Sequence, residues 1–541
     1  MALVQNPVLP GFNPDPSIVC TGDDFYIATS TFEWFPGVQI HHSKDLASWE
    51  LVAHPLDRVS QLDLKGVPCS GGVWAPDISY YNGTYYLIYS VVRNFGKPFY
   101  DVCNYLVTSP AVDGPWSDPV FLNSSGFDPS LFHDNDGRAW LVNMFFDYRT
   151  WKVRFGGIVL QEFSESEHKL TGKPEIIFTG TPAGTTEGPH LYRKDGYYYL
   201  LCAEGGTSYK HQAIIARSRS LKGPYETDPH NPLVTSYPYP ADELQKSGHA
   251  SMVQGPDGNW YLAHLCSRPA GRNKGSLAGG CCILGRETAV EQVVWKDGWP
   301  SMKQGSDKPL KEWESPFSVA GRKTAIYWKD DFEGKTWNIN FQSLRVPLGG
   351  RASLLVRRGW LRLYGKETLG SCFEQSLLAC RQQHFYMQVQ TKIDFKPLSF
   401  QQTAGLVYYY DTSAYYYAYI TADEQQGRMV SMMCCREKQI TQPLGAGIAV
   451  PAEGDITLRL VTAKETAQFF YSLAGRESFT ALGPVLDATV LSDDYFEQHG
   501  MGNRFTGSFA GICCQDISGA GLSADFDYFE YRELPSPGIL G

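Results

Sequence analysis

Three carboxylates in this sequence stand in similar local settings. They are Asp15 in Asn13-Pro14-Asp15-Pro16-Ser17, Asp128 in Phe127-Asp128-Pro129-Ser130 and Glu187 in Thr186-Glu187-Gly188-Pro189. A single acidic residue beside a proline most often marks a turn or the start of a strand. Acids at matching places in repeated units reverse that preference, because a repeated fold can bring equivalent positions together.

Two such carboxylates can catalyse the hydrolysis of a glycosidic bond. Hydrolysis with inversion needs a carboxylic acid that protonates the leaving oxygen and a carboxylate roughly 6.5–9.5 Å away that activates water. Glu187 is the best candidate acid, because its arm is longer and because apolar or like-charged surroundings would raise its pKa. Asp15 is the best candidate base, and Asp128 could orient Glu187 and keep its pKa high.

Three other polar residues accompany these acids. His249 could donate to the carboxylate cluster, or it could be a core histidine without a catalytic role. Asp77 could equally cap a turn, and we leave it outside the catalytic set. Arg286 lies in a Gly-rich segment of low charge, where a guanidinium is expected to pair with a carboxylate or with sugar hydroxyls. Surface exposure is the alternative for Arg286.

Three aromatic residues in or beside the repeats, Trp74, Phe32 and Phe146, could stack on the apolar face of a sugar ring. Each of them, taken alone, is more often a strand residue of the core. The sequence contains no glycine-rich phosphate loop, no pair of Cys-x-x-Cys zinc motifs and no Gly-x-Ser-x-Gly nucleophile elbow.

The elements that must position the acids are five repeated units of a β structure. Each unit has a polar residue near a proline or alanine, a short apolar run, a turn and an aromatic strand. The turns of four units contain Asn82-Gly83, Asp136-Gly137, Asp195-Gly196 and Asp257-Gly258, which are typical of tight hairpins. A spacing of roughly 50 to 60 residues is typical of propeller blades. The repeats therefore predict a five-bladed β-propeller.

The prolines agree with this prediction, since the innermost strand of a blade is an edge strand and tolerates a missing backbone donor. Rotational equivalence of the units would place Asp15, Asp77, Asp128, Glu187 and His249 at the starts of innermost strands, around one axis.

A second domain follows the propeller. At 541 residues the chain is too long for one core. We expect the propeller over 1–310, a polar linker over 311–326 and a second domain over 327–541. From Phe385 to Phe395 apolar and polar residues alternate, which is typical of a strand with one buried face. Similar segments without long helices predict a β-sandwich of the concanavalin or lectin-like type, so the whole chain is predicted to be all-β.

The composition argues against nucleic-acid and membrane partners and favours a cytoplasmic location. A net charge of −10 without a basic cluster argues against nucleic acid as a partner. The sequence shows no signal peptide and no run of about 20 apolar residues, so we expect no membrane association. An odd number of cysteines, thirteen, favours free thiols over disulfides. We expect a cytoplasmic protein, and the sequence leaves a homo-oligomer open.

The motifs together resemble those of glycoside hydrolase family 43, the β-xylosidases and α-L-arabinofuranosidases. The resemblance covers essentially the whole chain and is carried, in the order of the family, by Asn13-Pro14-Asp15-Pro16-Ser17, Val73-Trp74-Ala75-Pro76-Asp77, Phe127-Asp128-Pro129-Ser130, Thr186-Glu187-Gly188-Pro189 and Leu284-Gly285-Arg286-Glu287-Thr288.

This resemblance implies an inverting site with Asp15 as general base, Glu187 as general acid and Asp128 as the residue that tunes the acid. It also implies that Arg286 binds substrate, that His249 lies at the floor of the pocket, and that Trp74 and Phe32 line the sugar site. Similar xylosidases often have a tryptophan at the position of Phe146, so the pocket wall is expected to differ there.

The two-domain branch of this family closes its pocket with a phenylalanine from a loop of the sandwich. Phe505-Thr506-Gly507-Ser508-Phe509-Ala510-Gly511 resembles that loop, and we favour Phe509 over Phe505. Some relatives bind calcium near the central histidine. Because Ser251 is a weaker ligand than a carboxylate would be, we assign no metal and no other cofactor.

The expected function is that of an inverting, exo-acting β-xylosidase that releases xylose from the non-reducing ends of short xylo-oligosaccharides. An α-L-arabinofuranosidase, or a dual activity, on the same scaffold is the nearest alternative. A sugar-binding propeller without catalysis is the alternative from another class.

Overall fold

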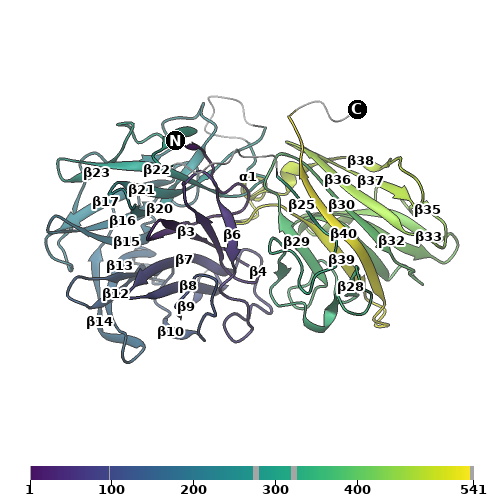
Figure 1. Cartoon of the computed structure of the whole chain (residues 1–541), viewed down its shortest axis with the longest axis horizontal. Coiled ribbons are helices and arrows are strands. Elements are labelled where there is room, and N and C mark those ends of the chain that lie inside the picture. Colours follow the sequence, from purple (N-terminus) through teal and green to yellow (C-terminus); the bar gives the residue numbers. More distant parts are fainter. Residues whose placement is uncertain (1, 97, 272–279, 318–325, 537–541) are drawn as a thin grey trace. The chain divides into compact units, whose positions relative to one another are not determined.

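The computed structural model describes residues 2–96, 98–271, 280–317 and 326–536. The chain divides into two compact units. One comprises Met1–Pro269 and Arg286–Gly321, and the other comprises Ala270–Arg272, Gly280–Gly285 and Arg322–Gly541. Both units consist almost entirely of β-strands (Figure 1).

The first unit contains five antiparallel sheets, one for each repeat of the sequence, and it is a five-bladed propeller as predicted. From the innermost strand outward, the first three blades are β2 (Ser17–Thr21), β3 (Asp24–Thr29), β5 (Gln39–Ser43) and β6 (Glu50–Ala53); β7 (Gly72–Tyr81), β8 (Thr84–Asn94), β9 (Asp101–Ser109) and β10 (Val120–Asn123); and β11 (Ser130–His133), β12 (Ala139–Phe146), β13 (Phe155–Ser164) and β14 (Lys169–Phe178).

The last two blades complete the ring. They are β15 (Glu187–Lys194), β16 (Tyr197–Glu204), β17 (Gln212–Ser218) and β18 (Glu226–Thr227), with β19 (Val234–Thr235) also paired to β17; and β20 (Gln245–Gln254), β21 (Trp260–Ser267), β22 (Glu287–Lys296) and β23 (Trp299–Met302). The innermost strands contact one another in sequence, and β20 returns to contact β2.

Residues from the two ends of this unit close the ring between the first and the last blade. β1 (Ala2–Gln5) pairs with β24 (Glu312–Ser315), and the Asn13 N–H donates to the Arg286 carbonyl at 2.9 Å. The Thr288 hydroxyl donates to the Asn13 carbonyl at 2.6 Å. The segment that carries Asp15 is therefore fixed to the segment that carries Arg286.

The hairpin turns follow the chemistry of their residues. Asn82 and Gly83, between β7 and β8, both have positive φ values of 48° and 82°. Two consecutive positive φ angles are the requirement of a type I′ turn, which asparagine and glycine meet with little strain. Asp195 and Gly196 repeat this geometry between β15 and β16, with φ values of 49° and 78°.

The second unit is a sandwich of two antiparallel sheets, which confirms the predicted fold class. The long sheet has the order β27 (Ala352–Ser353), β28 (Leu361–Tyr364), β40 (Ser523–Glu533), β30 (Tyr386–Asp394), β36 (Ile456–Ala463), β37 (Thr466–Leu473) and β38 (Thr480–Asp487), with β25 (Tyr327–Asp330) beside β40. The tyrosine-rich sheet has the order β29 (Leu377–Arg381), β39 (Phe509–Asp516), β31 (Gln402–Asp411), β32 (Ala414–Asp423), β33 (Gly427–Arg436) and β34 (Gln439–Thr441), with β35 (Ile448–Ala449) beside β33.

The core of the sandwich lies between its sheets. Val389 and Leu458 of the long sheet belong to the same buried cluster as Leu406, Tyr416 and Ile420 of the tyrosine-rich sheet. Because side chains of a strand alternate between its faces, Thr403, Tyr415, Tyr419 and the other intervening residues lie on the outer face of the tyrosine-rich sheet.

The remaining elements are short. They are β4 (Trp34–Phe35), β26 (Ser343–Leu344), the 3-10 turns η1 (Gly349–Arg351) and η2 (Ala488–Val490), and the helix α1 (Asp493–Gln498). Helix α1 begins after Ser492, whose hydroxyl accepts a hydrogen bond from the Tyr495 N–H at 3.2 Å, as an N-cap residue does. The expected linker over 311–326 contains β24, and its residues 318–325 lie outside the described residues. All thirteen cysteines are free thiols.

Candidate active site

At or near the starts of the innermost strands, the backbone adopts a left-handed conformation that sets the direction of the side chains. Asp15, Asp128 and His249 have positive φ values of 56°, 54° and 35°, and Gly188 has a φ of 57°. Each of these residues directly precedes the proline or alanine of its repeat. Positive φ is costly for a residue with a side chain, of order 1–3 kcal/mol, and such strain is typical of functional sites.

Blade four differs by one position from this pattern, because its left-handed residue is Gly188 and the carboxylate is the preceding Glu187. A Cβ atom on Gly188 would lie 3.0 Å from Cε1 of His249, so the imidazole packs directly against the glycine. The register between β15 and β16 shifts between Glu187 and His190. This bulge redirects the start of β15, as bulges beside active sites do.

Asp15 is a buried carboxylate with two strong partners. Its Oδ1 accepts a hydrogen bond from Nη1 of Arg286 at 2.8 Å, and its Oδ2 accepts one from the Ser30 hydroxyl at 2.7 Å. Burial acts to raise the pKa of Asp15, but the Arg286 charge and the Ser30 hydrogen bond outweigh it and hold the pKa below its usual value. Asp15 is therefore ionised at neutral pH, as a general base must be.

Glu187 and Asp128 form a second, coupled pair. Asp128 Oδ2 accepts a hydrogen bond from the Gly188 N–H at 3.0 Å, which ties Asp128 to the peptide that follows Glu187. Burial, followed by the charges of Asp128 and Asp15, raises the pKa of Glu187 well above its usual value. Burial and the charge of Asp15 raise the pKa of Asp128 to about 8. These shifts favour the protonated form of Glu187, which is the form that a general acid needs.

The pKa values of Asp15 and Glu187 are shifted in opposite directions because their surroundings differ. Arg286 lies against Asp15 and offsets its charge, whereas burial and like charges dominate at Glu187. Two carboxylates whose environments move their pKa values apart are the general arrangement of an acid and a base in one site.

His249 contacts this cluster without a direct hydrogen bond to Asp15. Its Nδ1 lies 3.9 Å from Asp15 Oδ1, which exceeds hydrogen-bonding distance. Burial lowers the pKa of His249 to about 4, so the imidazole is neutral near pH 7. A neutral ring packed against Gly188 and Asp15 fits the base of a pocket.

Asp77 differs from the expectation that five equivalent residues meet at the axis. It follows the proline of its repeat and therefore occupies the place of Ser17 rather than that of Asp15. Its Oδ1 accepts from the Ser17 hydroxyl at 2.8 Å and its Oδ2 accepts from the Leu131 N–H at 2.9 Å. His190 Nδ1 lies 3.5 Å from Oδ1. Asp77 thus joins the innermost strands of the first three blades.

The three aromatic candidates, Phe32, Trp74 and Phe146, are joined in one cluster by ring contacts, which we call the aromatic wall. The Phe32 and Trp74 ring centroids lie 6.0 Å apart, and the Arg286 guanidinium lies 5.2 Å from the Phe32 centroid. Phe146 stacks on Tyr100 at 4.3 Å, and Tyr100 in turn contacts Trp74 at 6.3 Å. Trp74 and Phe32 are buried, whereas Phe146 is partly exposed.

Sequence reasoning missed several residues of this site. Tyr100 belongs to the wall, and Glu187 is among the groups that raise its pKa, after burial. The Nδ1–H of His211 donates to the Lys246 carbonyl, 3.0 Å away, while its buried Nε2 has no hydrogen-bond partner among the described residues. Burial lowers the pKa of His211 to about 3. Neither residue belongs to a repeated motif, so the sequence offered no signal for them. Phe127 also contacts Trp74, at 5.2 Å, and its signal was its place beside Asp128.

The loop expected to carry a pocket phenylalanine is well defined within the second unit. Phe509 begins β39 and is buried, and the Arg381 guanidinium lies 5.4 Å from its ring. Phe505 is partly exposed. The Ser508 N–H and hydroxyl both donate to the Ile283 carbonyl, at 3.0 and 2.8 Å. The part that Phe509 plays in substrate binding stays a prediction.

Two features are absent from the described part of the chain. Within residues 2–96, 98–271, 280–317 and 326–536, no three His, Cys, Asp or Glu side chains are arranged to hold a metal ion. No helix in these ranges is long and apolar enough to cross a membrane.

Two family models match the chain, one over each unit. Residues 4–300 match the glycosyl hydrolases family 43, and residues 329–532 match the β-xylosidase C-terminal concanavalin A-like domain. The first match contains Asp15, Asp128, Glu187 and Arg286. The second contains both sheets of the sandwich apart from the first two residues of β25 and the last residue of β40.

Three similar proteins extend over nearly the whole chain. A β-xylosidase of Bacillus subtilis strain 168 is 49% identical and covers 98% of this chain and 99% of its own. A xylosidase/arabinosidase 43B of Humicola insolens is 45% identical over 99% of both chains. The crystal structure of a xylan β-1,4-xylosidase from Bacillus halodurans C-125 is 49% identical, has a TM-score of 0.93 and covers 98% of this chain and 100% of its own. Agreement of this extent, along both units, shows that the chain belongs to glycosyl hydrolase family 43.

Proposed function

We propose that this protein is an inverting, exo-acting β-xylosidase that releases xylose from the non-reducing ends of short xylo-oligosaccharides. The observation that carries the proposal is the opposite displacement of two pKa values in one buried cluster, lowered at Asp15 and raised at Glu187. The names of the full-length relatives support the sugar, since two of the three are xylosidases and the third is a xylosidase/arabinosidase.

In the proposed reaction, Glu187 gives its proton to the glycosidic oxygen as the bond to the anomeric carbon breaks. Asp15 removes a proton from a water molecule that attacks this carbon from the opposite face. Xylose leaves with inverted configuration, Glu187 is left ionised and Asp15 is left protonated. Exchange of one proton with solvent then restores both groups.

The other polar groups support these two steps. Arg286 holds Asp15 ionised through the 2.8 Å contact and can also donate to sugar hydroxyls. Asp128 orients Glu187 through the Gly188 amide and adds to its raised pKa. We assign His249 to the base of the pocket and Trp74, Phe32, Phe146 and Phe509 to its walls.

The decisive experiment compares two substrates. The rates of hydrolysis of an aryl β-xyloside and an aryl α-L-arabinofuranoside, measured as kcat/KM, should favour the xyloside. A strong preference for the arabinoside would refute the first choice. An arabinofuranosidase or a dual activity is the second candidate, because the Humicola relative carries both activities in its name.

Partners and location are also part of the proposal. We expect a xylo-oligosaccharide as the substrate, with no nucleic acid and no membrane as partners. Cytoplasmic location agrees with the thirteen free thiols, and fractionation of the native host would test it. Whether the chain forms a homo-oligomer is decided by light scattering after size exclusion.

A further inference from the structure

The sandwich contains a cavity of its own, built on the outer face of the tyrosine-rich sheet. Its volume is about 770 Å³, within the range of roughly 300–1,000 Å³ that is usual for small-molecule sites. Strands β31, β32, β33 and β39 supply its base, and the loops around Gly370, Gln401 and Ala446 supply its sides. All lining residues belong to the second unit.

The base of this cavity consists of the side chains that the sandwich core does not use. Thr403, Tyr415, Tyr419 and Gln515 line the cavity, whereas their neighbours along the strands, such as Ala404, Tyr416 and Cys514, lie in the core. These four lining residues are buried although the second sheet lies on the opposite face. The outer face is therefore hollowed rather than flat.

The lining groups have the chemistry of a site for a neutral, hydroxyl-rich ligand. Hydroxyl groups of threonine, serine and tyrosine and amide groups of glutamine alternate with aromatic rings and methionines. Asp423 and Lys438 are the charged side chains of the lining among the described residues, and their charges are opposite. A phosphate or a metal ion would need a concentration of one sign of charge or of hard ligands. A sugar needs hydrogen-bonding groups beside apolar surface.

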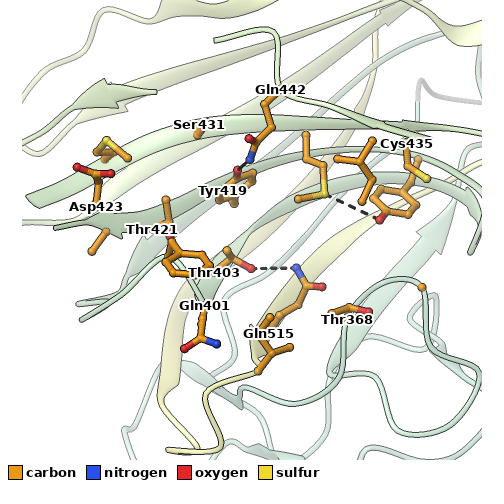
Figure 2. A pocket seen from close by; sticks show the side chains of 18 of the residues that line it. Thr368, Gln401, Thr403, Tyr419, Thr421, Asp423, Ser431, Cys435, Gln442 and Gln515 are labelled. Atoms are coloured by element: carbon orange, nitrogen blue, oxygen red, sulfur yellow. Dashed lines mark hydrogen bonds between the residues drawn. The ribbon is translucent and has the colours of Figure 1, made fainter. Parts of the chain in front are cut away.

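Several of these polar groups are already fixed in place. Gln442 Nε2 donates to Tyr419 Oη at 3.0 Å on one side of the cavity, and Gln515 Nε2 donates to Thr403 Oγ1 at 2.9 Å on the other (Figure 2). The Leu369 N–H donates to Gln515 Oε1 at 2.8 Å and fixes the orientation of this amide. Groups held in this way bind a ligand with little loss of side-chain entropy.

One buried hydroxyl in the lining lacks a partner within the described part of the chain. Ser431, labelled in Figure 2, is 2% exposed, and its Oγ makes no hydrogen bond there. A buried hydroxyl without a hydrogen bond is costly, and the cost is removed when a ligand supplies a partner. This group is a donor and an acceptor, as a sugar hydroxyl requires.

The rim of the cavity exposes apolar side chains. Phe400 is 63% exposed, and Ile440 and Ile517 are also exposed, although all three line the same hollow. A gathering of exposed apolar residues around a polar hollow marks a binding surface more often than single exposed residues do. The Phe400 ring offers a flat apolar surface for the C–H face of a pyranose.

We propose that this cavity is a second carbohydrate site, which binds a xylo-oligosaccharide on the sandwich independently of the three carboxylates. The identity of the sugar rests on the proposed function, whereas the class of ligand rests on the cavity alone. The site would retain long substrates on the protein between successive cleavages and would leave the hydrolysis of very short substrates unchanged.

The test measures the stoichiometry of xylohexaose binding by calorimetry. The full chain is used as the Glu187→Gln variant, so that the ligand is not hydrolysed during the titration. We expect two sites per chain. With Phe400→Ala added, one of the two should weaken by roughly tenfold or more, because the exposed ring no longer covers the sugar. Leu398→Ala is the matched control, since Leu398 is 83% exposed a short distance before Phe400 and does not line the cavity.

One site per chain, or two sites that Phe400→Ala and Leu398→Ala leave equally unchanged, would overturn the proposal. A parallel assay separates this result from a failure of the proposed function. In an otherwise unchanged chain, Phe400→Ala should hydrolyse an aryl β-xyloside at the unaltered rate. If the unsubstituted chain fails to hydrolyse that xyloside while two sites for xylohexaose persist, the proposed function fails and the sandwich site stands. If the chain hydrolyses the xyloside but binds xylohexaose at a single site, the sandwich site fails and the proposed function stands.

Discussion

At the scale of single residues, the proposed catalysis depends on a proton that stays on Glu187 and a charge that stays on Asp15. Burial and like charges produce the first state, and the Arg286 contact at 2.8 Å produces the second. Arg286 contacts Asp15 directly, whereas Asp128 is bonded to the Gly188 amide beside Glu187 and raises the pKa of Glu187 by its charge.

The substitution Glu187→Gln tests the acid. It keeps the shape of the side chain and removes the proton, so kcat on xylobiose should fall by roughly 10²–10⁴. The loss should be much smaller on an aryl xyloside with a nitrophenolate leaving group, which needs little protonation. Glu175→Gln is the control, because Glu175 is an exposed carboxylate that pairs with Lys222 on the surface. Equal losses on the two substrates would exclude Glu187 as general acid.

The substitution Arg286→Gln tests the base through the pH profile. The proposed mechanism requires Asp15 ionised and Glu187 protonated, so kcat/KM should fall below the pKa of Asp15 and above that of the Asp128–Glu187 pair. Without the guanidinium the pKa of Asp15 rises, and the acidic limb should move to higher pH. The quantity to measure is the pH at which kcat/KM falls on the acidic side, and not the maximal value of kcat/KM. An unmoved acidic limb would show that Arg286 does not set the charge of Asp15.

At the scale of elements, left-handed residues and bulges at the starts of the innermost strands decide which side chains meet. The repeat in the sequence was sufficient to predict the five blades and the approach of Asp15, Asp128 and Glu187. It was insufficient at Asp77, because Asp77 follows the proline of its repeat whereas Asp15 precedes its proline, and this difference changes the neighbours of the side chain. In blade four Gly188 occupies the left-handed position, and the carboxylate, Glu187, stands one residue before it.

The role of Asp77 is testable by stability. Asp77→Ala leaves the Ser17 hydroxyl and the Leu131 N–H without their acceptor inside the propeller. Each buried orphan group costs about 1–3 kcal/mol, so the thermal transition of the propeller should fall by several degrees. Calorimetry measures this fall, with Asp113→Ala at an exposed position as the control. If the variant kept its stability and lost its activity at a temperature where it is folded, Asp77 would belong to the catalytic set instead.

At the scale of the whole molecule, hydrophobic alternation was sufficient to predict a sandwich after the propeller. It could not reveal the cavity of the sandwich, because the outer face carries tyrosines that look like core residues in the sequence. Tyr415 and Tyr419 are as deeply buried as Tyr416, yet they line a hollow. Likewise Tyr100 and His211 come from segments without a repeated pattern, so only the folded chain brings them to the site.

The sandwich loop offers a separate prediction for the complete protein. If Phe509 lines the sugar site, Phe509→Leu should change KM or kcat for xylobiose while both thermal transitions remain near their original temperatures. Leucine is chosen because it keeps the buried position at the start of β39 filled. Phe505→Leu is the matched variant. Unchanged kinetics for Phe509→Leu together with altered kinetics for Phe505→Leu would move the assignment to Phe505.

The most direct test of the whole account is the configuration of the sugar at the moment of release. Proton NMR, recorded within the first minutes of hydrolysis of a β-linked aryl xyloside and before mutarotation, distinguishes the two anomers of free xylose. A water molecule activated by Asp15, opposite an acid at Glu187, produces α-xylose first, with β-xylose growing in later. Initial release of β-xylose would contradict the account, because it would require a covalent intermediate and a nucleophilic carboxylate in place of the base.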